Sequence, residues 1–241
     1  MQTESALLGG LGSIKVTRLR DEVLARLRTA IIAGHLQPDQ RLIEDDLARE
    51  LGVSRSPVRE ALALLAREGL ATTADTRGMF VRRFTAREVH ELFSLRAAFE
   101  TLAAEAALPR LGEADLAAME RLLEMQQVAH DGGDIHTSVE LDLRFHEVVF
   151  RVADHSLLLR HWNSIKGQLL LLFSIRQRAA RARHPDPYLA QRSHDHLLEA
   201  LRRRELAAVA EFHRTFNTQL AEQVGALVEQ TDPGRVGRDN D

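Results

Sequence analysis

The sequence contains no cysteine. A disulfide framework, catalysis by a thiol and a zinc site built on thiolates are therefore all excluded. A metal site in this chain would have to use histidine imidazoles and carboxylates.

Long apolar runs are also missing. The strongly apolar run Leu169–Phe173 is far shorter than the roughly 20 residues that a helix needs to cross a bilayer. The first residues do not show the succession of basic, apolar and small residues that is typical of a signal peptide. We therefore expect a cytoplasmic protein that does not enter a membrane.

A general excess of positive charge is absent as well, since the net charge is −3. The chain is therefore not expected to coat nucleic acid along its whole surface. The two parts differ, however: residues 18–83 carry 12 arginines against 10 acidic residues, and residues 84–241 carry 19 basic against 24 acidic residues. A partner of negative charge would more readily bind the N-terminal part.

The length of 241 residues favours two domains, because a typical domain holds about 100 to 150 residues. Apolar spacing of three and four residues predicts a helix from Leu19 to Gly34 and a second from Ile43 to Leu51. After the turn Gly52–Ser54, the pair Ser56-Pro57 is typical of a helix start and leads into a third helix that ends near Leu70.

Residues 71–83 change character, because two short extended runs flank the turn Asp75–Gly78. This pattern predicts a β-hairpin, or wing. Thr85 and Glu88 have the spacing of a capping box, which marks the start of a second, helical region. Six further helices are expected there, at residues 86–107, 113–130, 135–153, 156–182, 187–203 and 205–229.

The expected fold is thus mostly α, with an N-terminal winged helix-turn-helix at 18–83 and a C-terminal all-α bundle of about six helices at 84–230. Residues 1–17 are expected to form a flexible arm and residues 231–241 a disordered tail.

The start of the third helix carries side chains suited to DNA. In a helix-turn-helix the second helix enters the major groove with its N-terminal residues toward the bases. Arg55 and Arg59 can pair with guanine, and the hydroxyls of Ser54 and Ser56 suit phosphate oxygens. The alternative, that both arginines are solvated surface charges, stays open for either residue taken alone.

The hairpin favours DNA contact, because Arg77 and Gly78 lie at its tip. The minor groove has a negative potential that attracts arginine, so a wing at this position could insert Arg77 there.

Residues 19–81 resemble the winged helix of the GntR family of bacterial regulators. The matching positions are Gly34, Leu36 and Pro38, then Gly52-Val53-Ser54-Arg55, Pro57-Val58-Arg59-Glu60-Ala61-Leu62, Glu68-Gly69-Leu70, Arg77-Gly78 and Val81. The resemblance implies that Arg55 and Arg59 are principal DNA contacts, Ser54 and Ser56 phosphate contacts, and Gly78 the turn of the wing. Asp45 departs from the pattern, since some relatives place a DNA-contacting arginine there.

A second set of polar residues suits a metal ion. Asp142 and His146 are four residues apart in a helical pattern and project from one face, where both could bind one ion. His194 and His213 belong to two later helices. Carboxylate and imidazole ligands from separate helices of a bundle suit zinc, nickel or manganese, although Asp–His pairs at this spacing are also common without a metal.

Residues 85–225 resemble the ligand-binding domain of the FadR-like branch of the same family, through Glu91, Arg96, Glu100, the pair Asp142 and His146, and His194–Leu201. Relatives that bind metal use one Asp and three His, and Asp142, His146 and His194 match the first three positions. The fourth falls on Phe216, which cannot bind a cation, and His213 lies about one helical turn earlier. Either His213 reaches the ion, or a water or effector oxygen replaces the ligand, or the domain binds its effector without metal.

Arg96 has two interpretations. An arginine inside a bundle needs an anion to offset its desolvation, and Glu100, one turn away, could supply it within the protein. The resemblance instead implies contact with an effector, since relatives often sense the carboxylates of organic or sugar acids. The arginine-rich run 176–183 could add positive charge to the same pocket or form a solvated face.

Together these features predict a homodimeric repressor that binds operator DNA and is released by a small carboxylate. Arg96, Asp142, His146 and His194 are the expected effector contacts. A metal-dependent hydrolase is one alternative, because a three-ligand metal site with an open position could activate water. A stand-alone metal- or ligand-binding protein and a purely structural helical scaffold are the others. No motif for a general base, a nucleophile elbow or a phosphate loop supports the enzyme.

Overall fold

The computed structural model describes residues 16–74, 78–183 and 188–230. Most of the predicted N-terminal arm, Arg77 of the wing and the predicted tail therefore lie outside the described residues. The first helix, α1 (Val16–Ala33), begins inside the range predicted as an arm, so that Val16 and Thr17 are helical rather than part of it.

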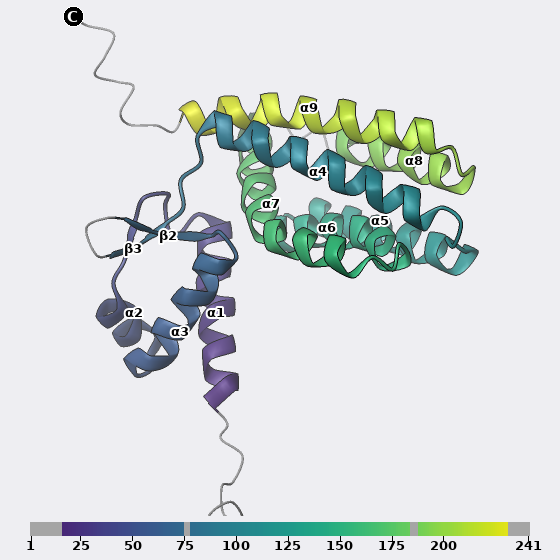
Figure 1. Ribbon diagram of the computed structural model, residues 1–241. Coiled ribbons are helices and arrows are strands. Elements are labelled where there is room, and N and C mark those ends of the chain that lie inside the picture. Colours follow the sequence, from purple (N-terminus) through teal and green to yellow (C-terminus); the bar gives the residue numbers. More distant parts are fainter. Residues whose placement is uncertain (1–15, 75–77, 184–187, 231–241) are drawn as a thin grey trace, which may run out of the picture.

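The N-terminal part contains the expected helix-turn-helix (Figure 1). α2 (Glu44–Leu51) ends at Gly52, whose φ of 67° lies in the left-handed region that favours glycine. α3 (Arg55–Arg67) follows after the three residues Gly52–Ser54 and packs against α1 and α2. The apolar positions of the three helices face one core, which includes Ile31, Leu47 and Leu65.

The start of α3 differs from the prediction. Ser54, with extended backbone angles of φ −74° and ψ 166°, precedes the first helical residue Arg55, so the helix begins before the predicted Ser56. Pro57 then lies third in the helix, where its missing N–H would have had no partner within the helix. The proline is thus compatible with a start two residues earlier, and both Arg55 and Ser56 belong to the first turn.

The wing is a sheet of three strands rather than two. β2 (Ala71–Ala74) and β3 (Gly78–Val81) pair antiparallel, as the hairpin pattern predicted. β1 (Arg41–Leu42) adds to the other edge of β3, which gives the strand order β1-β3-β2. A strand of two residues has no detectable alternation, so no pattern in the sequence predicts it.

The C-terminal part is the expected all-helical bundle, and the described helices follow the predicted ranges to within two residues. They are α4 (Ala86–Ala107), α5 (Glu113–Asp131), α6 (Ile135–Val152), α7 (Ser156–Arg183), α8 (Tyr188–Arg202) and α9 (Leu206–Gln230). α4 begins at the predicted capping box, since the Glu88 amide donates to the Thr85 hydroxyl and Glu88 accepts from the Thr85 amide. The predicted fold class is confirmed.

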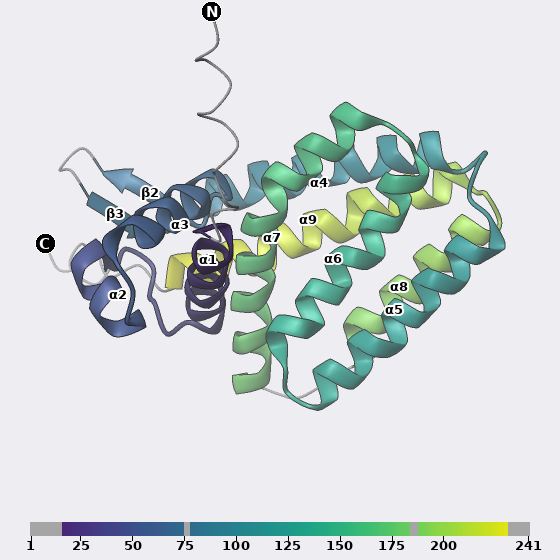
Figure 2. The ribbon, with the colours of Figure 1, turned by 90° about the horizontal axis from the view of Figure 1, so that it is seen from below.

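The long helices α4 and α9 run antiparallel along one side of the bundle, where α8 lies beside α9, and α5 and α6 lie on the other side (Figures 1 and 2). The core between them includes Phe93, Phe145 and Leu169. None of the described helices is both long enough and apolar enough to span a membrane.

α7 joins the two parts of the molecule, because it lies in the bundle and also against α1 (Figure 2). Arg178 donates a hydrogen bond to the carbonyl of Ile32 near the end of α1. Gly167 allows α7 to approach the end of α3, since a Cβ atom there would lie only 2.8 Å from the carbonyl oxygen of Glu68. A change in the position of α7 would therefore move α1 and α3 as well.

Candidate metal centre and DNA-binding surface

The first turn of α3 exposes the predicted DNA contacts. Ser54, Arg55, Ser56 and Arg59 are all exposed. Pro57 and Val58, on the opposite side of the same turn, are buried in the core, and this fixes the rotation of the helix. The four polar residues therefore form one accessible surface at the helix start.

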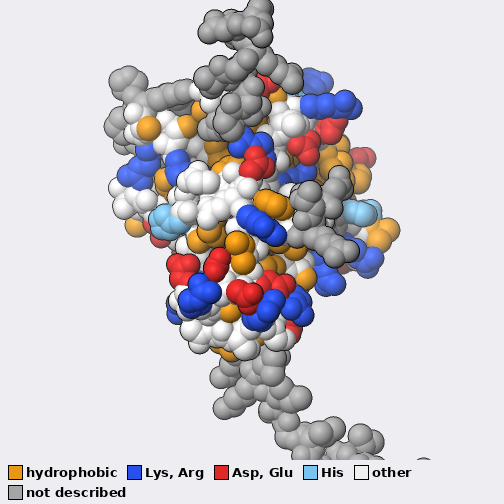
Figure 3. Space-filling view, turned by 90° about the vertical axis from the view of Figure 1, so that its left-hand side faces the viewer, with side chains coloured by type: hydrophobic (Ala, Val, Ile, Leu, Met, Phe, Trp, Pro, Cys, Tyr) orange, Lys and Arg blue, Asp and Glu red, His pale blue; other side chains and the backbone are white. Residues whose placement is uncertain are grey.

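The two arginines of this surface form ion pairs with acidic side chains of α2. Arg59 donates to the carboxylate of Glu44 at 3.0 to 3.2 Å, and Arg55 Nε lies 2.9 Å from Asp45 Oδ1. The hydrogen bond from Arg59 lowers the pKa of Glu44, which stays ionised. Basic and acidic side chains accordingly lie side by side at the level of α2 and α3 in Figure 3.

The wing residues are described only in part. Gly78 begins β3 and pairs with Ala74, so it directly follows the predicted turn. Arg77 lies outside the described residues.

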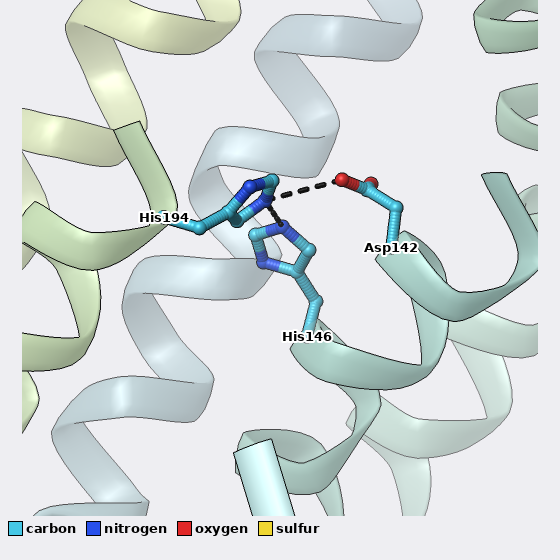
Figure 4. Close-up of side chains that lie close together, drawn as sticks. All are labelled: Asp142, His146 and His194. Atoms are coloured by element: carbon cyan, nitrogen blue, oxygen red, sulfur yellow. Dashed lines mark hydrogen bonds and ion pairs between the residues drawn. The ribbon is translucent and has the colours of Figure 1, made fainter. Parts of the chain in front are cut away.

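In the bundle, three of the predicted metal ligands come together. Asp142 and His146 project from α6 and His194 projects from α8 toward them (Figure 4). His146 Nε2 lies 3.2 Å from His194 Nε2, which in turn lies 3.1 Å from Asp142 Oδ1. Gln126 of α5 donates to the same Asp142 oxygen at 3.2 Å and helps to orient it.

The spacing of these three atoms fits a divalent ion. Two ligand atoms that each lie about 2.0 to 2.2 Å from one ion are separated by roughly 2.8 to 3.6 Å at octahedral or tetrahedral angles. The two distances between neighbouring ligand atoms fall in this range. Nitrogen and carboxylate oxygen are also the donor types that zinc, nickel and manganese accept.

The protonation states suit the same role. Burial lowers the pKa of His146 to about 3 although Glu100 opposes the shift, so its imidazole is neutral at neutral pH. Burial alone would raise the pKa of Asp142, but His194 and His146 outweigh it and keep the carboxylate ionised. Neutral imidazole and ionised carboxylate are the forms that bind a metal ion.

His213 takes a different place from the other three predicted ligands. It is buried and does not join the group formed by Asp142, His146 and His194. Its Nδ1 lies 2.9 Å from Glu100 Oε2 instead. The other oxygen of that carboxylate lies 3.0 Å from His146 Nδ1, so Glu100 stands between two of the four predicted ligands.

Arg96 is completely buried and forms the ion pair that the sequence allowed as one interpretation, with its Nε 2.8 Å from Glu100 Oε1. Its guanidinium lies 4.8 Å from the centre of the Phe173 ring. Both terminal nitrogens lack a hydrogen-bond partner within the described part of the chain. Burial would raise the pKa of Glu100, but Arg96 and the two histidines hold it well below its ordinary value.

A small cavity of about 20 Å³ adjoins two of the three ligands, Asp142 and His194. Its lining includes Asp142, His194, Phe173, Phe216 and Arg176. Phe216, at the fourth ligand position of the resemblance, thus faces the site, with its ring centre 6.3 Å from that of His194. Arg96 is not part of the lining.

Two residues here have roles that the sequence did not identify. Arg176 belongs to a run for which a solvated face was the favoured interpretation and a place at the pocket the alternative, and it lines the cavity. Burial lowers its pKa and Asp142 opposes that shift, so the structure places a cation beside the carboxylate. Glu100 was considered only as a partner for Arg96. The helical spacing of four to Arg96 was its only local signal.

Comparisons with known proteins match both parts of the chain to protein families. Residues 19–81 match the model of the bacterial regulatory proteins of the gntR family, and residues 91–217 match the FCD domain. An uncharacterized HTH-type transcriptional regulator of Bacillus subtilis (strain 168), YdhC, is 35% identical over 52% of this chain and 56% of its own. The gluconate operon transcriptional repressor of Bacillus licheniformis is 35% identical over 65% of each chain. The matches thus span between about half and two thirds of these relatives.

The solved structure of Escherichia coli McbR/YncC is 25% identical and covers 88% of this chain and 97% of its own, with a TM-score of 0.67. The family and these relatives are regulators of transcription rather than enzymes. This agrees with the prediction of a regulator. Since the FCD match alone covers more than half of the chain, the protein belongs to the GntR family of bacterial regulatory proteins and carries an FCD domain.

Proposed function

We propose that this protein is a repressor that binds a two-fold-symmetric operator as a homodimer and is released when a small carboxylate binds in the bundle. Residues 18–83 would bind the DNA and residues 84–230 the effector. The observation that carries the proposal is the convergence of Asp142, His146 and His194 beside the cation Arg176, in a chain that also exposes Arg55 and Arg59 at a recognition helix. Such a protein acts in the cytoplasm, where its operator lies.

On the DNA side, Arg59 and Arg55 would exchange their carboxylate partners for base edges and phosphates of the major groove. Ser54 and Ser56 would contact phosphate oxygens at the helix start. Gly78 would shape the wing, and Arg77, which precedes it in the sequence, would enter the minor groove.

On the effector side, Asp142, His146 and His194 would hold one zinc, nickel or manganese ion and leave coordination positions open. Phe216 fills the place of a fourth protein ligand without offering a donor atom. A carboxylate oxygen of the effector would bind there, and Arg176 would neutralise its charge. Arg96, which does not line the cavity, would act on the anion through its charge from behind Phe173.

Two observations support a class of effector: this chemistry, and the similarity to a relative that is named a gluconate operon transcriptional repressor. We infer a hydroxy acid or sugar acid, because its carboxylate and hydroxyl oxygens can both bind one ion. Such a molecule is larger than the cavity of about 20 Å³, so the lining must open to admit it.

Opening of the cavity would change the position of the DNA-binding part through α7. Gln177 lines the cavity and its neighbour Arg178 bonds to Ile32 of α1. Displacement of this segment by an effector would shift α1 and, with it, the recognition helix. By linkage, the effector weakens DNA binding only as far as it prefers the displaced arrangement.

The test is fluorescence anisotropy of the full chain on labelled DNA from upstream of its own gene, over a series of salt concentrations. The wild type should bind selectively and with a steep salt dependence, and Arg59→Ala should bind more weakly. Addition of Zn²⁺ with gluconate or a related hydroxy acid should then release the DNA. Tight binding of every such acid without change in DNA affinity would contradict the coupling.

A further inference from the structure

Glu100 occupies an unusual place, because a single carboxylate lies at the meeting point of three helices. It projects from α4 and is only 2% exposed. Its partners are Arg96 on its own helix, His146 on α6, and His213 and Asn217 on α9. A buried carboxylate needs polar partners, and here two of the four are imidazoles, whose Nδ1 atoms lie within 3.0 Å of it.

The two carboxylate oxygens of Glu100 contact different residues. Oε1 lies 2.8 Å from Arg96 Nε and 3.0 Å from His146 Nδ1. Oε2 lies 2.9 Å from His213 Nδ1 and 3.1 Å from Asn217 Nδ2. Only the first oxygen therefore acts on the group of three candidate ligands.

The contact with Oε1 determines which nitrogen of His146 faces the other ligands. A neutral imidazole that donates from Nδ1 to a carboxylate keeps its proton there and presents the lone pair of Nε2. Nε2 is the atom that lies 3.2 Å from His194 Nε2, on the side of the metal centre. A carboxylate at this position thus orients the ring and fixes the tautomer that a metal ion requires.

The same carboxylate explains where His213 lies. Because Oε2 lies against its Nδ1, His213 is kept behind the three ligands rather than among them. Arg96 balances the charge, so that a carboxylate can remain ionised in a fully buried position.

We propose that Glu100 is a positioning residue of the metal centre: through Oε1 it holds His146 in the tautomer that points Nε2 toward the ion, and through Oε2 it keeps His213 in the layer behind. The inference rests on the proposed metal centre of Asp142, His146 and His194. It adds a fourth residue to that centre, one that orients the imidazole of His146.

The test compares Zn²⁺ affinity, by calorimetry on the metal-stripped full chain, between the wild type and two variants. Glu100→Gln removes the negative charge that faces His146 Nδ1 and leaves a single amide oxygen for the partners of both carboxylate oxygens. It should weaken Zn²⁺ binding about 10- to 100-fold, as is usual when the partner of a ligating histidine is lost. Asn217→Leu is the matched control, because it removes a buried hydrogen bond to the same carboxylate but leaves the contact between Oε1 and His146. It should bind Zn²⁺ within about 3-fold of the wild type.

Thermal unfolding of each variant separates lost stability from lost affinity. Equal weakening in both variants, or none in Glu100→Gln, would overturn the positioning role while leaving the metal centre in place. If the wild type itself bound no Zn²⁺, both proposals would fail.

A measurement on the wild type covers the case in which Glu100→Gln does not fold. ¹⁵N NMR of the imidazoles, with the His146 signals assigned from a His146→Gln spectrum, should show the proton on Nδ1 both with and without Zn²⁺. A proton on Nε2 in the metal-free protein would overturn the proposal.

Discussion

The two ends of the molecule hold an arginine against a glutamate at nearly the same distance, yet in opposite surroundings. At the DNA-binding end Arg59 lies 3.0 Å from Glu44, and these side chains are 66% and 27% exposed. In the bundle Arg96 lies 2.8 Å from Glu100, at 0% and 2% exposed. Contact distance alone therefore says little about what a pair does.

The surroundings decide whether the pair can open. An ion pair in water contributes about 0 to 1 kcal/mol, so Arg59 can leave Glu44 at little cost when a phosphate or base arrives. A buried charge without its partner costs about 3 to 5 kcal/mol, so Arg96 and Glu100 stay together. The exposed pair suits exchange of partners, and the buried pair suits a fixed framework for a binding site.

The largest effect that this comparison predicts is on stability. Arg96→Met should lower the free energy of unfolding by about 3 to 5 kcal/mol, because Glu100 is left buried with its charge no longer balanced. Arg59→Ala should change it by less than about 1 kcal/mol. Urea denaturation of both variants measures the difference, and a similar loss in the two would refute the distinction between the pairs.

The second effect is on DNA. Arg59→Ala should weaken selective binding by about 10- to 100-fold, because one arginine contact to a base is worth roughly 1 to 3 kcal/mol. Arg87→Ala is the matched control: Arg87 is also exposed and pairs with a glutamate, Glu91, but lies on α4. It should leave DNA affinity nearly unchanged in the same anisotropy assay. Equal losses in the two variants would mean that general charge, and not Arg59, determines binding.

The smallest effect concerns the acidic partners at the recognition helix. Asp45→Asn removes a negative charge that binds Arg55 and would repel a phosphate. We expect affinity for DNA of unrelated sequence to rise by about 2- to 5-fold, in keeping with the small energy of exposed ion pairs. Asp154→Asn, an exposed acid in the bundle, serves as control. An unchanged affinity in Asp45→Asn would show that this carboxylate does not compete with DNA.

Local signals were enough for most of the fold. The capping box of Thr85 and Glu88 marked the start of α4 correctly, because both hydrogen bonds join residues three apart. The start of α3 was placed too late because Ser56-Pro57 is a frequent helix start, and no local rule ranks it below Ser54. β1 was missed because its two residues owe their structure to pairing with β3.

The candidate site was predictable only where its residues share a helix or match the family pattern. Asp142 and His146 have helical spacing, and the resemblance added His194. The contact between Glu100 and Asn217 joins residues 117 positions apart, which periodicity cannot reveal. Arg176 looked like other arginines of its run, and only the packing of α7 against α6 and α9 places it at the cavity.

The most direct test of the account is a calorimetric titration of the metal-stripped full chain with Zn²⁺, comparing the wild type with His194→Gln and His196→Gln. His196 lies two residues further along α8 and is exposed, so it is a matched control for the buried His194. We predict one tightly bound ion per chain in the wild type and in His196→Gln, and loss of that binding in His194→Gln. The same binding in all three proteins, or none in the wild type, would contradict the proposed metal centre.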